Sequence, residues 1–196
     1  VIIGSRKAER AVTAAEEVAA TVPGASVSGC GNEEATAQAG VVIISVPFEH
    51  TAGTVKGIKT SLREGQILVS MAVPLATAVG DGAVRTLGIW QGSCAEMVAS
   101  LVPDGVEVVS AFQNVSAHRL RDLENEVDCD IVVSGKKKAR ETVMGLCGLI
   151  PGLRGINGGL LSNAKIVEEM TALMIGINIR HKLPEGVGVR FTGLPE

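Results

Sequence analysis

The segment Gly4–Lys7, which reads Gly-Ser-Arg-Lys, carries residue types that bind phosphate groups, and Arg10 follows one helical turn later. It comes directly after a short β-branched run, so Ser5 and Arg6 are expected at the carboxyl edge of a parallel sheet. In a dinucleotide-binding fold this edge of the second strand faces the adenosine ribose. Guanidinium groups form paired hydrogen bonds with phosphate oxygens, so Ser5, Arg6 and Arg10 favour the 2′-phosphate of NADP over the 2′-hydroxyl of NAD. The alternative is a solvated basic helix start, which the helix dipole disfavours.

A second group of polar residues, Ser45–His50, ends an apolar segment and reads Ser-Val-Pro-Phe-Glu-His. A proline at the end of a strand exposes backbone groups and an apolar surface, against which a cofactor ribose or ring could lie. His50 could donate a hydrogen bond to a cofactor or act as an acid. A surface histidine in the first turn of a helix fits the sequence equally well.

The third candidate segment, residues 111–118, reads Ala-Phe-Gln-Asn-Val-Ser-Ala-His and follows another apolar strand. It joins the two predicted regions of the chain, where small-molecule sites tend to lie. Gln113 and Asn114 could bind a ligand there or could be turn residues. The sequence contains no Gly-x-Ser-x-Gly, His-Glu-x-x-His or Walker motif. Lys136–Lys138 reads as a solvated helix start.

Apolar runs and amphipathic stretches alternate along most of the chain. Strands are expected at 1–4, 25–28, 40–47, 66–70, 106–110 and 130–134, and helices at 7–20, 32–39, 48–61, 95–101, 136–149 and 162–180. The run that begins at Gly40 is apolar on both faces, as a parallel strand covered by helices on each side must be. This alternation predicts an α/β fold with a Rossmann-type, doubly wound parallel sheet.

The pattern weakens after Ser110, which divides the chain into two predicted regions. Residues 1–110 are expected to form a dinucleotide-binding domain of the Rossmann type. Residues 111–196 are expected to form a small C-terminal helical region, which ends in an ordered tail from Leu183 to Glu196.

The composition is that of a globular protein with no nucleic-acid surface. Of the 196 residues, 46% are hydrophobic, and the net charge of −3 comes without a separate basic block. One Trp, three Phe and no Tyr leave few rings for stacking on bases. The longest uncharged run, 65–80, is shorter than a bilayer span of about 20 residues, and no basic-then-apolar leader is present. The four cysteines lie far apart, so we expect reduced, packed thiols in a cytoplasmic protein.

Taken in order, these segments resemble the NADPH-dependent coenzyme F420 reductases. The resemblance is carried by Gly-Ser-Arg at 4–6, Ser-Val-Pro-Phe-Glu-His at 45–50, Ser-Ala-Phe-Gln-Asn-Val-Ser-Ala at 110–117, Gly-Gly-Leu-Leu-Ser-Asn-Ala-Lys at 158–165 and Gly-Val-Gly-Val-Arg-Phe at 186–191. It implies hydride exchange between NADP(H) and coenzyme F420, a deazaflavin. We also expect a homo-oligomer, such as a dimer.

The resemblance implies roles for single residues on the NADP side. Ser5, Arg6 and Arg10 would hold the 2′-phosphate, and Val46 and His50 would line the cofactor cleft.

On the F420 side, Ala117 would meet the nicotinamide end through its backbone, and Val115 would pack beside the pair of rings. Val187 in the tail would touch the deazaflavin. We therefore expect F420 in a crevice between residues 112–117 and the tail segment 184–191.

The sequence departs from the family at its start, because the family has a strand, a Gly-rich turn and a helix before the position of Val1. Gly29–Asn32 does not replace them, since it lacks a third glycine and follows the wrong strand. In the strand order 3-2-1-4-5-6 the first strand is central, so its absence would separate the strand at Val1 from the strand at Val41. We expect the chain to be a fragment without its first roughly 25 to 30 residues, the length of one βα unit.

Two alternatives remain open. Imine and 2-keto-acid reductases that use NADP share this fold and carry a lysine or another polar catalytic group on a long helix, where Lys165 lies here. A non-catalytic, degenerate nucleotide-binding or dimerisation module would fit the missing first unit. Hydride transfer between two aromatic rings needs stacked, dry rings more than a protein acid or base, so the absence of a catalytic pair favours the F420 reductase.

Overall fold

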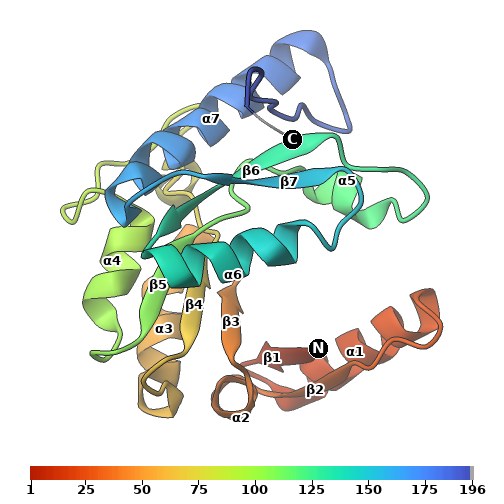
Figure 1. Cartoon of the computed structure of the whole chain (residues 1–196), viewed down its shortest axis with the longest axis vertical. Coiled ribbons are helices and arrows are strands. Elements are labelled where there is room, and N and C mark those ends of the chain that lie inside the picture. Colours follow the sequence, from red (N-terminus) through yellow and green to blue (C-terminus); the bar gives the residue numbers. More distant parts are fainter. Residues whose placement is uncertain (195–196) are drawn as a thin grey trace.

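Strands and helices alternate from Ile2 to His181 in the computed structural model, which describes residues 1–194 (Figure 1). The strands are β1 Ile2–Ser5, β2 Ser28–Gly31, β3 Val41–Ile44, β4 Ile67–Ser70, β5 Glu107–Ser110, β6 Cys129–Gly135 and β7 Leu153–Asn157. The helices are α1 Ala8–Thr21, α2 Asn32–Gln38, α3 Phe48–Ile58, α4 Cys94–Leu101, α5 Ala117–Arg121, α6 Lys137–Cys147 and α7 Ala164–His181. The strand expected at 25–28 lies at 28–31 instead, because Ser28 rather than Ala25 is the residue that pairs with the start of β1.

Five strands form the larger sheet, in the order β3-β4-β5-β6-β7. β3, β4 and β5 are parallel and in step, so Ile44, Ser70 and Ser110 lie side by side at their carboxyl ends. β6 is antiparallel to β5, and β7 is parallel to β6. The predicted α/β fold of the Rossmann type is confirmed, with one antiparallel step where the C-terminal region begins.

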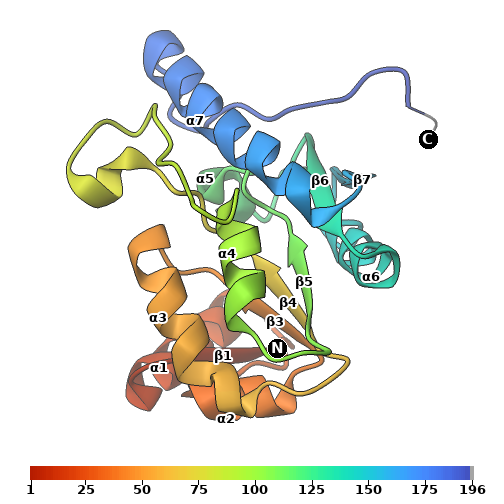
Figure 2. The same ribbon diagram turned by 90° about the vertical axis from the view of Figure 1, so that its left-hand side faces the viewer.

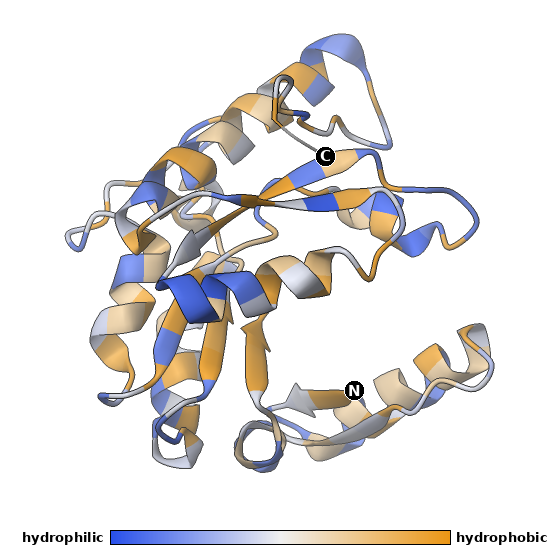
Figure 3. Ribbon diagram, viewed as in Figure 1, coloured by the Kyte–Doolittle hydropathy of each residue, from blue (hydrophilic) through white to orange (hydrophobic). Residues whose placement is uncertain are grey.

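Helices cover both faces of the larger sheet, with α3 and α4 on one side and α6 on the other, as Figure 2 shows. Leu68 and Val108 belong to the core cluster that contains α3 and α4 residues, whereas their neighbours Val69 and Val109 belong to the cluster that contains α6 residues. β3 and most of β4 are strongly hydrophobic, whereas β5 begins with the hydrophilic Glu107 (Figure 3). Burial on both faces explains the apolar residues of β4 and β5. The same expectation for the run at Gly40 was wrong on one face, because β3 lies at the edge of the sheet and Ile43 is 47% exposed.

The region after Ser110 contributes strands as well as helices. β6 was expected, but β7 and the short helix α5 were not. β7 has Arg154 and Gly155 in its middle, where neither alternation nor a β-branched run marks a strand. A glycine is required at 155, because a Cβ there would lie 2.8 Å from the Cα of Met144 in α6.

β1 and β2 form a separate two-stranded parallel sheet, with α1 packed against it. β1 does not pair with β3, which confirms the expected separation of these two strands. α1 approaches β2 closely at Gly29, where a Cβ would lie 2.1 Å from the carbonyl oxygen of Ala11. This close contact sets the direction in which α1 leaves the end of β1. None of the helices in residues 1–194 is long and apolar enough to cross a membrane.

Candidate functional site

A cavity of about 570 Å³ lies at the carboxyl ends of β1 and β2, and we call it the β1–α3 cavity. Its lining comes from the end of β1, the start of α2 and one face of α3: Ser5, Arg6, Gly31, Asn32, Glu33, Glu49, His50, Gly53, Thr54, Gly57 and Ile58. Its volume is in the range of small-molecule sites. The structure thus brings together residues from two separate motifs: Ser5 and Arg6 from the first, and His50 from the second.

Ser5 and Arg6 lie where the chain turns from β1 into α1. The backbone amide of Lys7 donates a hydrogen bond of 3.2 Å to Ser5 Oγ, so the hydroxyl proton of Ser5 is the group available to a phosphate oxygen. Arg6 is exposed beside the N-terminus of α1, where the helix dipole attracts anions. No ion pair within residues 1–194 engages its guanidinium group. The turn therefore offers a hydroxyl, a guanidinium and a helix N-terminus to an anion.

Of the other three residues expected on the NADP side, only His50 lines the same cavity as Ser5 and Arg6. Arg10 is exposed on α1 and is outside the lining of the β1–α3 cavity. Val46 is half-buried and lines a narrower cavity of about 130 Å³ between β1 and β3. His50 is the third residue of α3, and its backbone amide donates a 2.9 Å hydrogen bond to the carbonyl of Pro47. Its exposed side chain faces the β1–α3 cavity.

The charge of the β1–α3 cavity is mixed. Glu33 and Glu49 line it together with Arg6 and His50. A dianionic group is therefore not attracted by the cavity as a whole. The attraction comes from Arg6 and the N-terminus of α1, at the β1 end.

The segment that follows β5 is fixed by two buried amide side chains. Gln113 Nε2 donates hydrogen bonds to the carbonyl of Ser70 (3.0 Å) and to Ser110 Oγ (2.7 Å). Asn114 Nδ2 donates a 2.6 Å hydrogen bond to the carbonyl of Asp130 in β6. Gln113 and Asn114 are therefore buried structural residues, which connect the ends of β4 and β5 to the start of β6, rather than surface turn residues.

Two features of this segment are unusual for a simple connection. Phe112 has a φ of 68°, a left-handed conformation that few non-glycine residues adopt. The oxygens Gln113 Oε1 and Asn114 Oδ1 are buried without a hydrogen-bond partner among the described residues. Buried acceptors of this kind mark places where a water or a bound group completes the hydrogen bonding.

The residues expected beside the two rings lie on the same segment but face different ways. Val115 is half-buried and packs against the core cluster under α6. Ala117 is exposed and is the first residue of α5, where Ser116 Oγ accepts a 3.2 Å hydrogen bond from the amide of His118. The backbone at Ala117 is thus at the surface, whereas Val115 is part of the sheet's packing.

The tail returns from the end of α7 to this segment. Arg119 Nε donates a 3.0 Å hydrogen bond to the carbonyl of Gly186, and the Val187 amide donates one of 2.8 Å to Asn178 Oδ1. Gly186 has a φ of 78°, and a Cβ on it would lie 3.1 Å from Ser116 Oγ. The tail and residues 112–117 are therefore in contact, as the crevice hypothesis requires.

The open space beside the tail is a cavity of about 610 Å³, which we call the tail cavity. It is lined by residues of α5, the start of β6 and the tail: Arg119, Asp128, Leu183, Pro184, Glu185, Gly186, Val187, Gly188 and Arg190. Val187 is among them, whereas Val115 and Ala117 are not. The structure thus places one of the three residues expected on the F420 side in this cavity.

Residues of α7 that sequence reasoning missed connect the tail to the strand ends. Thr171 Oγ1 donates a 3.1 Å hydrogen bond to the carbonyl of Gln113, and Asn178 binds the Val187 amide. The two residues are seven positions apart and so lie on one face of the helix. That spacing of polar residues is the only signal that the sequence offers for them. Lys165, at the start of the same helix, is exposed and pairs with Glu169 at 3.8 Å.

Glu168 is a buried carboxyl group on α7. Its oxygens accept hydrogen bonds from the backbone amides of Cys94 (2.9 Å) and Ala95 (3.2 Å) at the N-terminus of α4. Burial raises the pKa of Glu168 to about 7, although the two amide hydrogen bonds lower it; Glu96 and Glu169 add to the rise. The carboxyl group therefore joins two helices and titrates near neutral pH.

The cysteines and the acidic residues do not form a metal or thiol site. All four cysteines are free, and burial raises the pKa of Cys94 to about 12 and that of Cys147 to about 11. Thiols with such pKa values are packing groups rather than nucleophiles. Within residues 1–194 no group of three or more His, Cys, Asp or Glu side chains is placed to hold a metal ion.

Comparison with known sequences gives matches along the whole chain. The sequence model of a family described as "NADP oxidoreductase coenzyme F420-dependent" matches residues 1–74. The F420-dependent NADP reductase of Methanocaldococcus jannaschii is 44% identical over 99% of this chain and 88% of the relative. The enzyme of the same name from Methanothermobacter marburgensis is 38% identical over all of this chain and 88% of its own.

Comparison with solved structures supports the fold. A crystal structure of a protein from Arthrobacter sp. fb24 superposes with a TM-score of 0.78 at 20% identity, over 97% of this chain and 88% of the other. At this identity the likeness concerns the fold alone. It extends over both regions of the chain, including the C-terminal strands and α7.

Proposed function

This chain belongs to the family of F420-dependent NADP reductases, and we propose that it is an oxidoreductase that transfers a hydride between NADP(H) and coenzyme F420. The observation that carries the proposal is the 44% identity to the M. jannaschii reductase over nearly the whole chain. The shared length includes the segments that form the β1–α3 cavity and the tail cavity. We assign residues 1–110 to NADP(H) binding and residues 111–196 to F420 binding.

On the NADP side, we propose that Ser5, Arg6 and Arg10 bind the 2′-phosphate, with Val46 and His50 along the cofactor. The β1 end of the β1–α3 cavity fits a phosphate, because a hydroxyl, a guanidinium and a helix N-terminus meet there. Arg10 can reach the same anion only from outside the cavity lining. We therefore expect Arg6 to contribute more to the discrimination between NADP and NAD than Arg10.

On the F420 side, we propose that the deazaflavin lies where the tail meets residues 112–117. Val187 would touch the deazaflavin from the tail, and the Ala117 backbone would face the nicotinamide end. Val115 would pack beside the pair of rings on the side of the sheet core. The contact between Gly186 and Ser116 supports this arrangement, because it holds the tail beside the segment. The unpartnered oxygens of Gln113 and Asn114 also lie in this segment.

The chemistry itself needs little from acidic or basic side chains. When the two coenzymes are bound, the nicotinamide and deazaflavin rings supply and accept the hydride. The residues of this chain set the distance between the rings and keep water away. Gln113 and Asn114 tie residues 111–117 to three strand ends, and Thr171 ties the same segment to α7. We infer that the main catalytic contribution of the protein is to hold residues 111–117 in a fixed position beside the two rings.

We also propose that the protein is a homo-oligomer that works in the cytoplasm. Four free cysteines are compatible with a reducing compartment. α7 exposes Ile166 and Leu173 (66% and 60%), seven residues apart on one face, and Trp90 is 98% exposed. An apolar patch on one face of a helix supports a subunit interface, whereas a single exposed apolar side chain is ordinary on a protein surface. Sedimentation of the protein should give more than one chain per particle, and a monomer at micromolar concentration would refute this.

The activity is tested by mixing the protein with NADPH and oxidised F420 and following the loss of the visible absorbance band of the deazaflavin. We expect turnover with F420 and none with a cyclic imine or a 2-keto acid in its place. Oxidation of NADPH by an imine or a keto acid, without F420 turnover, would favour the reductases that use a lysine such as Lys165. Absence of any turnover with intact binding of NADPH would favour a non-catalytic nucleotide-binding module.

A further inference from the structure

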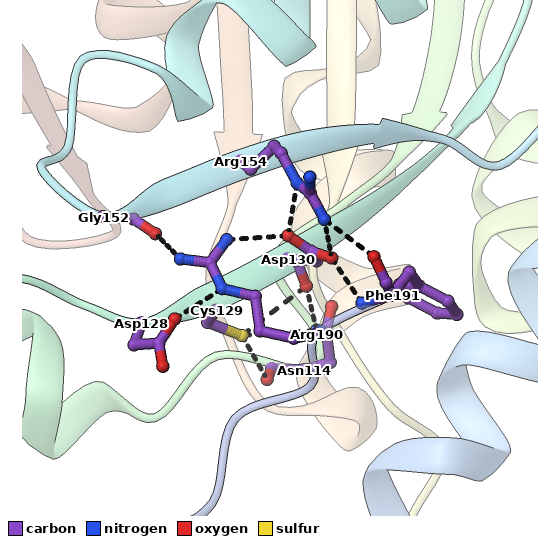
Figure 4. A network of polar contacts seen from close by, with 8 residues as sticks. All are labelled: Asn114, Asp128, Cys129, Asp130, Gly152, Arg154, Arg190 and Phe191. Atoms are coloured by element: carbon purple, nitrogen blue, oxygen red, sulfur yellow. Dashed lines mark hydrogen bonds and ion pairs between the residues drawn. The ribbon is translucent and has the colours of Figure 1, made fainter. Parts of the chain in front are cut away.

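Asp130 is a completely buried carboxylate at the second position of β6, and it is bound by groups from two directions. Arg154 of β7 donates to it twice, from Nε to Oδ1 and from Nη2 to Oδ2, both at 2.9 Å. From the tail, Arg190 Nη1 donates to Oδ1 (2.8 Å) and the Phe191 amide donates to Oδ2 (2.7 Å). Figure 4 shows the carboxylate between the two arginines.

The other hydrogen bonds of the network also join the tail to the strands. The Asp130 amide donates to the carbonyl of Val189 (2.7 Å), and Arg154 Nη2 donates to the carbonyl of Phe191 (2.9 Å). Arg190 Nη2 donates to the carbonyl of Gly152 (2.6 Å), and its Nε donates to Asp128 (Figure 4). The tail from Val189 to Phe191 is thus bound to β6 and β7 through both backbone and side chains.

This attachment is polar rather than hydrophobic. None of the tail's apolar side chains is fully buried: Leu183, Phe191 and Leu194 are 42%, 39% and 44% exposed, and Val187 and Val189 are half-buried. Although burial alone would raise the pKa of Asp130, the bonds from Arg154, Phe191 and Arg190 hold it at about 2. The carboxylate is therefore charged at any ordinary pH, and a buried charge of this kind requires its partners.

The attachment begins at Val189, two residues after Val187. On the other side of Val187, Gly186 is held by Arg119 and Val187 itself by Asn178. The segment 186–188 is therefore held by α5 and α7 at Gly186 and Val187, and Gly188 lies against the start of β6, where a Cβ would be 2.7 Å from the carbonyl oxygen of Asp128. We expect loss of the attachment to β6 to let this segment shift relative to residues 112–117.

We propose that Asp130 is a positioning residue, which acts through Arg190 to hold Val187 and the wall of the tail cavity at the place where F420 binds. The inference rests on the proposed function, since it concerns the F420 side of that site. The proposal therefore predicts that changes at Asp130 and Arg190 weaken the binding of F420 and leave the binding of NADP unaffected. Arg154 of β7 binds the same buried carboxylate from the side of the sheet.

The test uses Arg190→Gln, which removes the hydrogen bonds of the Arg190 guanidinium to Asp130, Asp128 and the carbonyl of Gly152. The pair between Asp130 and Arg154 and the backbone hydrogen bonds of Val189 and Phe191 stay intact. We expect the KM for F420 to rise about tenfold or more, because a displacement of about 1 Å in the wall of a site can cost this much, while the KM for NADPH changes less than about twofold. Arg190→Lys should restore part of the loss. The matched control is Arg85→Gln, which removes an exposed arginine that pairs with Asp81 at 3.4 Å.

A second measurement, amide hydrogen exchange by mass spectrometry, needs no F420. We expect Arg190→Gln to speed exchange in residues 186–191 while β6 and β7 remain protected. Unchanged exchange in the tail would overturn the role of Arg190 as its anchor. Faster exchange with an unchanged KM for F420 would overturn the link to the site. If the unaltered protein exchanges no hydride with F420, the proposed function fails, and the exchange data still decide whether Arg190 holds the tail.

Discussion

Replacing Glu168 by glutamine removes a buried carboxyl group from the contact between α7 and α4 while keeping its shape. In the folded protein the pKa of Glu168 is raised to about 7 from an ordinary value of 4.5, and burial is the main cause. Between these two pH values the folded state binds more protons at this residue than the unfolded state does. The contribution of Glu168 to stability therefore falls as the pH rises from 4.5 to 7.

The size of the effect follows from the shift. One pKa unit corresponds to about 1.4 kcal/mol, so Glu168 should cost the folded state about 3 kcal/mol once the pH exceeds 7. The glutamine variant should lack this slope. Its free energy of unfolding, relative to the unaltered protein, should therefore rise by about 3 kcal/mol across the range.

The assay is urea unfolding followed by circular dichroism at a series of pH values. Glu141→Gln is the matched control, because it removes the same charge from α6, where the side chain is 59% exposed and pairs with Lys137. We expect the control to follow the pH dependence of the unaltered protein. If Glu168→Gln also follows it, then Glu168 ionises as an exposed carboxyl group does and the reasoning from its burial is wrong.

Three further predictions concern the two coenzyme sites and the tail. Arg6→Gln should weaken NADP binding by roughly 1.5–3 kcal/mol, about ten- to a hundredfold in Kd, and leave NAD binding unchanged; equal losses in calorimetric titrations of both would refute the role of Arg6. Val115→Trp should reduce kcat/KM for F420 by about tenfold or more and change the Kd for NADP little. The Tm of the variant checks that it is folded. Unimpaired F420 turnover would mean that the ring does not lie beside this segment. Because the pKa of Asp130 is lowered to about 2 from 3.8, its stabilisation is complete above pH 3.8 and is lost as the pH falls through 2. Asp130→Asn should flatten this acid limb, which amounts to about 2 kcal/mol, and an unaltered acid limb in the variant would contradict the network.

The larger sheet could be predicted from the sequence because β3, β4 and β5 each contain a run of apolar residues, and a helix follows β3 directly. β4 and β5 are buried on both faces, whereas β3 is an edge strand that exposes Ile43 on one face. β7 could not be found in this way, since Arg154 and Gly155 occupy its middle. Arg154 is there to bind Asp130 and Gly155 to let α6 approach, and both reasons are tertiary contacts without a local pattern.

The candidate site was predictable where a residue follows directly on a strand. Ser5, Arg6 and His50 could be placed at the edge of a sheet because their strands could be recognised. Asp130 and Arg190 could not be paired, since they are 60 residues apart in the sequence and each resembles a surface charge. Glu168 is hidden in the same way, because a carboxylate on a long helix usually faces solvent, and only the structure shows the amides of α4 around it.

The claim that this protein moves a hydride directly from one coenzyme to the other is tested by isotope transfer. NADPH that carries deuterium at the transferable position of its nicotinamide ring, on the face that the enzyme uses, is mixed with oxidised F420 and the protein in ordinary water. The reduced F420 is then analysed by mass spectrometry. Our account predicts that the deuterium appears in the reduced F420 within a single turnover. Deuterium that is lost to water would contradict it. Deuterium that stays in the NADP product would also contradict it, if this happens with NADPH labelled on either face of the ring.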